Sequence, residues 1–190
     1  MERGISAMEH IILYGSKYGS TRQYAEALSR QTGIPALRYQ DAPNLSDKKT
    51  IIYLGGLYAG GILGLSKTFR GFSLRDGQRL MIITVGLSDP AHPETRENIR
   101  RSLQGQISDQ LLRSASVFHL RGGIDYQTLS RGHRLLMSLL FQSVRRTPEE
   151  NRTAENQEFL ETYGKKVTFV DFGSLAPILQ VMRQQDASAQ

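Results

Sequence analysis

The sequence predicts an α/β protein in which helices cover both faces of a parallel sheet. Short apolar runs rich in β-branched residues recur along the chain without polar alternation, which is typical of strands buried on both faces. Amphipathic stretches separate these runs, and successive strands start roughly 30 residues apart, as in βαβ units. Such units are joined by right-handed crossovers, so a doubly wound sheet is expected.

The elements follow from these patterns in order. Strands are predicted over 10–14, 36–39, 50–55, 79–87 and 116–121, with the strongest signal at 79–87. Helices are predicted over 21–31, where Gly33 is a stop signal, over 63–69, and over 93–112 with an interruption at Gly105. Residues 41–49 and the glycine-rich run 55–61 are expected to be loops.

The last third of the chain is longer than a five-stranded sheet requires. Residues 131–146 predict a helix with an apolar middle and arginine-rich ends, and the acidic stretch 148–163 follows it. An extended piece is expected over 167–171, and a last helix over 174–184 with Ser174 as its cap and Pro177 in its first turn. We therefore expect one domain over 1–190, with a helical elaboration over 122–166.

Composition excludes several kinds of site. The 190 residues include no cysteine, so a disulfide scaffold, a thiolate nucleophile and a thiolate-bound metal are excluded. The four histidines are scattered, and no metal site is predicted. No run approaches the roughly 18–20 apolar residues of a membrane span, and the first ten residues lack the apolar core of a signal peptide. A cytoplasmic protein is expected.

The net charge of +6 comes mostly from arginine and is spread over both halves of the chain. Such a surface suits anionic lipid, nucleic acid or an acidic partner, or is simply solvated. No nucleic-acid partner is predicted.

The segment between the first strand and the first helix has the composition of an anion site. Ser16, Ser20 and Thr21 offer hydroxyl groups, while Gly15 and Gly19 let the backbone turn its N–H groups inward. Neutral donors at the start of a helix suit a terminal phosphate. The spacing matches neither a P-loop nor a dinucleotide fingerprint.

From Ile12 to Thr21, and on to Ala25 and Leu28, this segment resembles the FMN-phosphate loop of flavodoxins. The resemblance implies the strand order 2-1-3-4-5, FMN as cofactor and electron transfer as function. Flavodoxins hold the flavin ring with the loops after their third and fourth strands, here 55–61 and 86–89. The implied cofactor-binding residues are Ser16, Lys17, Tyr18, Gly19, Ser20, Thr21, Gly56, Leu57, Tyr58, Ala59, Gly60, Gly86, Leu87, Ser88, Asp89, Gly122 and Gly123.

Two of these residues have alternative roles. Tyr58 either stacks on the flavin ring or is a surface tyrosine of a flexible loop. Asp89 either repels the anionic reduced flavin or caps the turn before Pro90.

Residues 120–126 and the apolar stretch after them resemble flavodoxin-domain proteins related to menaquinone-dependent protoporphyrinogen oxidase, which carry a long insertion near the fifth strand. Residues 161–166 and 169–171 are similar to uncharacterised bacterial members of that group. The resemblance implies an oxidoreductase that passes electrons from a porphyrinogen-like or other reduced donor to a quinone. The positive charge agrees, because electron-carrier flavodoxins are acidic and dock on basic reductases.

Other interpretations stay open from the sequence. The chain is alternatively a flavodoxin-type electron carrier that serves a redox partner protein, or a domain that has lost its cofactor, although the intact phosphate loop argues against the latter. No catalytic acid or base is identified. The helix over 131–146 is expected to pack on its own domain, to form a subunit contact, or to face a quinone or the inner surface of a membrane.

Overall fold

The computed structural model describes residues 9–58 and 61–187. Its central sheet has five parallel strands in the order β2-β1-β3-β5-β6. When only these five strands are numbered along the chain, the order is 2-1-3-4-5, which confirms the prediction. The strands are β1 (His10–Gly15), β2 (Ala36–Arg38), β3 (Thr50–Tyr58), β5 (Arg79–Gly86) and β6 (Ala115–Arg121).

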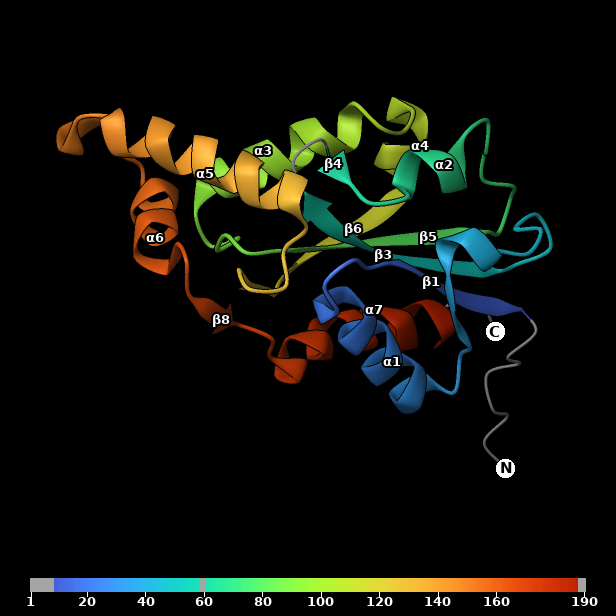
Figure 1. Cartoon of the computed structure of the whole chain (residues 1–190). Coiled ribbons are helices and arrows are strands. Elements are labelled where there is room, and N and C mark those ends of the chain that lie inside the picture. Colours follow the sequence, from blue (N-terminus) through green and yellow to red (C-terminus); the bar gives the residue numbers. More distant parts are fainter. Residues whose placement is uncertain (1–8, 59–60, 188–190) are drawn as a thin grey trace.

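Helices cover both faces of this sheet (Figure 1). One face is covered by α1 (Ser20–Thr32) and α7 (Ala176–Ala187), and the other by α2 (Leu65–Phe69), α3 (Pro93–Gln104) and α4 (Asp109–Ser114). Within β1, Ile12 packs in the core beneath α1 and α7, whereas its neighbours Ile11 and Leu13 pack in the core on the opposite face. This two-sided burial is why the strands are continuously apolar.

The third strand is longer than the sequence pattern indicates. Residues 55–58 continue β3, and a short antiparallel strand, β4 (Gly61–Ile62), pairs with its end. The glycines there permit a close approach, because a Cβ on Gly55 would lie 2.0 Å from Cγ2 of Ile62. The prediction of a loop over 55–61 was therefore wrong for residues 55–58, which belong to β3.

Two helix predictions need adjustment. The stretch 93–112 forms two helices, α3 and α4, and Ser108 caps the second by accepting a hydrogen bond from the Leu111 amide. Ser174 lies inside a 3₁₀ helix, η3 (Phe172–Leu175), so the prediction that it caps the last helix was wrong. The Asp171 side chain caps η3 through the Gly173 amide, at 2.8 Å.

The segment 122–166 and the strand residues after it lie beyond the carboxyl edge of the sheet (Figure 1). Its elements are β7 (Gly123–Asp125), α5 (Arg131–Arg146), η2 (Glu149–Asn151), α6 (Ala154–Thr162) and β8 (Lys166–Thr168). Strands β7 and β8 pair antiparallel at its base. The rings of Phe141 and Tyr163 stack with centroids 4.0 Å apart and join α5 to the end of α6.

The outer surface of α5 is unusually apolar. Leu135 and Leu139 are 63% and 61% exposed, and Val144 is the buried residue of this helix. The helix is therefore not a core element of the sheet domain. Among the helices of the described residues, none is long and apolar enough to cross a membrane.

Candidate functional site

The predicted phosphate loop connects the end of β1 to the start of α1. Gly19 has a φ of 102°, a conformation that favours glycine, and its amide donates a hydrogen bond to Ser16 Oγ at 3.2 Å. No side chain caps α1, as is also the case for α2 and α3, whereas α4, α5 and α6 are capped by Ser108, Ser130 and Thr153. The first-turn amide groups of α1 are thus left to bind an anion.

Gly15 was expected to let the backbone of this loop turn, but the structure requires glycine there for a different reason, the close packing of a neighbouring segment. Its φ is not positive, and a Cβ there would lie 2.1 Å from the carbonyl oxygen of Leu63. The chain that leaves β4 crosses directly over the end of β1, and only glycine leaves room for it.

Tyr58 lies at the end of β3 and contacts the first loop. Its hydroxyl oxygen accepts a hydrogen bond from the Lys17 amide at 3.0 Å, and its ring meets the Tyr18 ring edge-on at 5.8 Å. Burial raises the pKa of the Tyr58 hydroxyl, so this side chain is neutral at pH 7. Tyr58 is therefore partly buried and contacts the first loop.

The loops after β5 and β6 are also joined to the first loop. The Gly122 amide donates to the Gly86 carbonyl at 2.6 Å, and the Gly123 amide donates to Ser20 Oγ at 3.1 Å. A Cβ on Gly56 would come within 3.1 Å of Thr21 Oγ1, and one on Gly122 within 3.3 Å of the Ser20 Cβ. Glycine at 56 and 122 therefore keeps the space around the start of α1 open.

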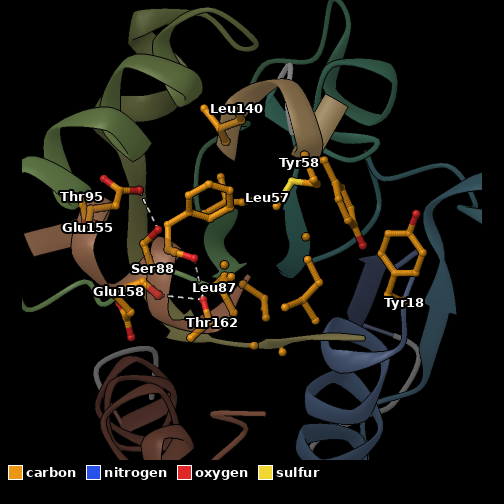
Figure 2. Close-up of a pocket in the computed structure, with 18 of the residues that line it drawn as sticks. Tyr18, Leu57, Tyr58, Leu87, Ser88, Thr95, Leu140, Glu155, Glu158 and Thr162 are labelled. Carbon is orange, nitrogen blue, oxygen red and sulfur yellow. Dashed lines mark hydrogen bonds between the residues drawn. The ribbon is translucent and has the colours of Figure 1, made fainter. Parts of the chain in front are cut away.

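These loops border a pocket of about 430 Å³ (Figure 2). Most of the residues predicted to bind the cofactor line it, namely Tyr18, Ser20, Thr21, Gly56, Leu57, Tyr58, Gly86, Leu87, Ser88, Gly122 and Gly123. Ser16, Lys17 and Gly19 form the turn behind it, and Asp89 lies outside its lining. Ala59 and Gly60 fall outside the described residues.

Asp89 has the turn-capping role that the sequence left open. Its Oδ1 accepts a hydrogen bond from the Ala91 amide at 2.8 Å, and its Oδ2 lies 3.5 Å from Arg121 Nη1. Arg121 also pairs with Glu158 and covers the Phe169 ring at 3.7 Å. Asp89 thus shares the Arg121 guanidinium with Glu158.

The wall of the pocket opposite the predicted loops comes from α5 and α6. Leu136, Met137, Leu140 and Val144 line it from α5, and Phe159 lines it from α6. Because the α5 residues recur at helical spacing, they share one face of the helix. The apolar character of this stretch is evident from the sequence, but its place in the pocket is not.

His133 also lines the pocket, which was not expected from the sequence. Its Nδ1 lies 2.6 Å from the Tyr18 hydroxyl, and its Nε2 lies 3.4 Å from Lys17 Nζ. Its ring stacks near the Tyr58 ring, with centroids 6.1 Å apart and planes inclined by 28°. His133 thereby joins the start of α5 to the predicted phosphate loop and to Tyr58. His133 lies three residues before Leu136 in α5 and therefore on the same face of the helix. This spacing is the sequence feature that could have placed His133 at the pocket.

The model of the flavodoxin domain family matches residues 11–152. Among solved structures, oxidised flavodoxin 1 from Bacillus cereus is similar at 16% identity, with 80% of this chain and 97% of that chain covered and a TM-score of 0.37. A flavoprotein in complex with FMN from Lactobacillus acidophilus is similar at 9% identity, with coverage of 60% and 91% and a TM-score of 0.42. No curated protein matches.

Proposed function

Because this chain belongs to the flavodoxin domain family, we propose that FMN is its cofactor and that the loops at the carboxyl edge of its sheet hold it. When bound, FMN supplies one- or two-electron transfer. The observation that carries the proposal is the uncapped start of α1 at one side of a pocket bordered by the loops of four parallel strands. Ligands of such sheets bind at this edge.

The residues at the start of α1 fit the phosphate group of FMN. The amides of the first turn point outward from an uncapped helix end, and the hydroxyl groups of Ser20 and Thr21 line the pocket beside them. No acidic residue lies in the first turn of α1, and Lys17 precedes it. The local field is therefore positive, which favours a phosphate dianion.

We propose that Tyr58 stacks on the isoalloxazine ring. Its neutral ring lines the pocket and is held by the Lys17 amide. Replacing Tyr58 with Ala should raise the fluorescence of the bound flavin, because the aromatic quencher is lost, and should weaken FMN binding by about 0.5–1.5 kcal/mol. Fluorescence titration with FMN measures both quantities. If both values match those of the unmodified protein, another residue supplies the ring contact.

We further propose that the protein is an oxidoreductase of the menaquinone-dependent protoporphyrinogen oxidase type. In this proposal, segment 122–166 is an elaboration of a single domain that encloses a second substrate. The apolar face of α5 and the Phe159 ring of α6 support this proposal, because they close the pocket from the side opposite the phosphate loop. A carrier that only exchanges electrons at an exposed flavin edge has no need of such a wall.

The outer face of α5 supports a peripheral contact with a membrane that contains the quinone. Leu135 and Leu139 are exposed in the middle of the helix, and arginines occupy both of its ends. An amphipathic helix of this kind lies in the interface of an anionic bilayer, with its basic residues at the headgroups. Each arginine near the surface contributes about 1 kcal/mol, which salt weakens.

The test uses chemically reduced, FMN-loaded protein and phosphatidylglycerol vesicles with or without a membrane quinone. We expect the protein to bind the vesicles and its flavin to be reoxidised faster when they contain quinone. Replacing Leu135 and Leu139 with Ser should abolish both effects, and adding salt should weaken binding. The control is Leu37→Ser, because Leu37 is an exposed leucine on the distant strand β2.

If the unmodified protein does not bind the vesicles and its reduced flavin is oxidised by a soluble redox protein instead, the protein is an electron carrier. The membrane proposal is then wrong. The same conclusion about the membrane follows if the leucine variant binds the vesicles as well as the Leu37→Ser control does.

A further inference from the structure

The hydroxyl group of Tyr58 lies in the predicted phosphate loop. The Lys17 amide donates a hydrogen bond to it at 3.0 Å. Burial raises the pKa of this hydroxyl, whereas the backbone amides of Lys17 and Tyr18 act to lower it, as N–H groups directed at its oxygen do. Two successive N–H groups that converge on one point form a concavity suited to an anion. The Tyr58 oxygen therefore lies where this loop would bind an anion.

The donors proposed to hold the phosphate group surround the same place. An added Cβ on Gly56 would lie 3.0 Å from the Tyr58 hydroxyl oxygen and 3.1 Å from Thr21 Oγ1. Both hydroxyl groups thus adjoin Gly56, and Thr21 is in the first turn of α1, which no side chain caps. A phosphate held by Thr21 and the loop amides would consequently meet the Tyr58 hydroxyl and compete with it for the Lys17 amide.

Ring contacts keep Tyr58 at this end of the pocket independently of its hydroxyl (Figure 2). The Tyr18 ring meets the Tyr58 ring edge-on at 5.8 Å, and the His133 ring lies near-parallel to it with centroids 6.1 Å apart. Tyr18 and His133 are themselves joined, since the Tyr18 hydroxyl lies 2.6 Å from His133 Nδ1. The Tyr58 ring therefore still has partners when its hydroxyl gives up the amide.

We propose that the Tyr58 hydroxyl is an internal ligand of the phosphate loop, which the phosphate group of a bound monoester displaces. The exchange is favourable because a charged phosphate oxygen is a stronger acceptor for N–H groups than a neutral hydroxyl. The bond that Tyr58 loses nevertheless lowers the affinity of the loop for phosphate. The inference rests on the proposed function, since FMN is the monoester proposed there, and it adds a competitor that is part of the chain.

Removing this hydroxyl should strengthen phosphate binding. Calorimetric titration with inorganic phosphate, at constant ionic strength and without flavin, compares the unmodified protein with Tyr58→Phe. The variant should bind phosphate about three- to tenfold more tightly, because no internal hydrogen bond has to be broken. The proposal is overturned if Tyr58→Phe binds phosphate as weakly as the unmodified protein, or if neither protein binds it.

The matched control is Tyr24→Phe. The Tyr24 hydroxyl also accepts a hydrogen bond from a backbone amide, that of Asp171 at 2.9 Å, but Tyr24 lies in the core outside the pocket lining. This variant loses the same kind of contact, and it should bind phosphate as the unmodified protein does. An equal gain in Tyr24→Phe would show that the effect does not arise at the loop, and would refute the proposal.

FMN and riboflavin extend the test to the proposed cofactor. Tyr58→Phe should bind FMN about three- to tenfold more tightly than the unmodified protein does. Riboflavin lacks the phosphate, so it should bind both proteins alike, and an equal gain for riboflavin contradicts the proposal. Tyr58→Ala removes the ring together with the hydroxyl, so the weaker FMN binding expected for it is the net result of two opposing effects.

The two proposals fail in different ways. If Tyr58→Phe binds phosphate more tightly and neither protein binds FMN, only the cofactor assignment is wrong. If both proteins bind FMN with equal affinity, only the internal ligand is wrong. Should Tyr58→Phe not fold, Tyr58→Leu also lacks the hydroxyl, and its affinity for inorganic phosphate should rise by the same factor. An unchanged affinity in that variant overturns the inference.

Discussion

FMN affinity is expected to fall by about 2–4 kcal/mol, roughly 30- to 900-fold, when Ser16→Ala and Thr21→Val are combined. Ser16 Oγ accepts the hydrogen bond of the Gly19 amide, and Thr21 is a buried residue of the pocket lining in the first turn of α1. The double variant therefore loosens the loop and removes one hydroxyl donor to the phosphate. Fluorescence titration of purified, flavin-free protein measures the change.

Two controls restrict the effect to the phosphate. Riboflavin lacks this group, so it should bind weakly, with nearly equal affinity for the unmodified protein and the double variant. Thr32→Val makes the same chemical change at the far end of α1, where the hydroxyl donates to the Leu28 carbonyl, and should leave FMN affinity unchanged. A folded double variant with full FMN affinity would show that the phosphate binds elsewhere.

The Gly15→Ala variant should lose about 3 kcal/mol of the free energy of unfolding. The added Cβ would lie 2.1 Å from the Leu63 carbonyl oxygen and 3.3 Å from the Tyr53 hydroxyl. Tyr53 donates to that same carbonyl at 2.5 Å, so the chain over Gly15 is anchored and does not move away easily. In a domain of this size the unfolding temperature should fall by about 6–12 °C.

The matched control is Gly132→Ala. Gly132 lies in the first turn of α5, its φ is not positive, and an added Cβ would meet no atom within 4 Å. Alanine there should stabilise the helix by about 0.5–1 kcal/mol. If thermal unfolding shows Gly15→Ala to be as stable as Gly132→Ala, the packing of Leu63 over β1 is not as described.

The sheet was predictable because its signal is local. Each strand is a continuous apolar run, so β1 and β5 were found almost to the residue. Helix α5 was predicted with its observed bounds, since its apolar middle lies between arginine-rich ends. Glycines made the sequence misleading at 55–58, where no turn requires them: Gly55 makes room for Ile62, and Gly56 for the side chains of Tyr58 and Thr21.

The second side of the pocket was not predictable in the same way. His133 meets Tyr18 across 115 residues, and Ser88 meets Glu155 across 67. Neither pair leaves a periodic pattern in the sequence, because the fold alone sets these contacts. The loop between β1 and α1 could be predicted as a unit because its residues are consecutive. By contrast, Ser88, Thr95 and Glu155 of the pocket lining come from the end of β5, from α3 and from α6.

The central claim is that the pocket at the carboxyl edge of the sheet binds FMN, and equilibrium titration of flavin-free protein tests it most directly. We expect saturable binding of one FMN per chain with a Kd of about 1 μM or below, together with a shift of the visible flavin spectrum. A folded protein, verified by circular dichroism, that leaves the FMN spectrum and fluorescence unchanged at about 1 mM would contradict the account.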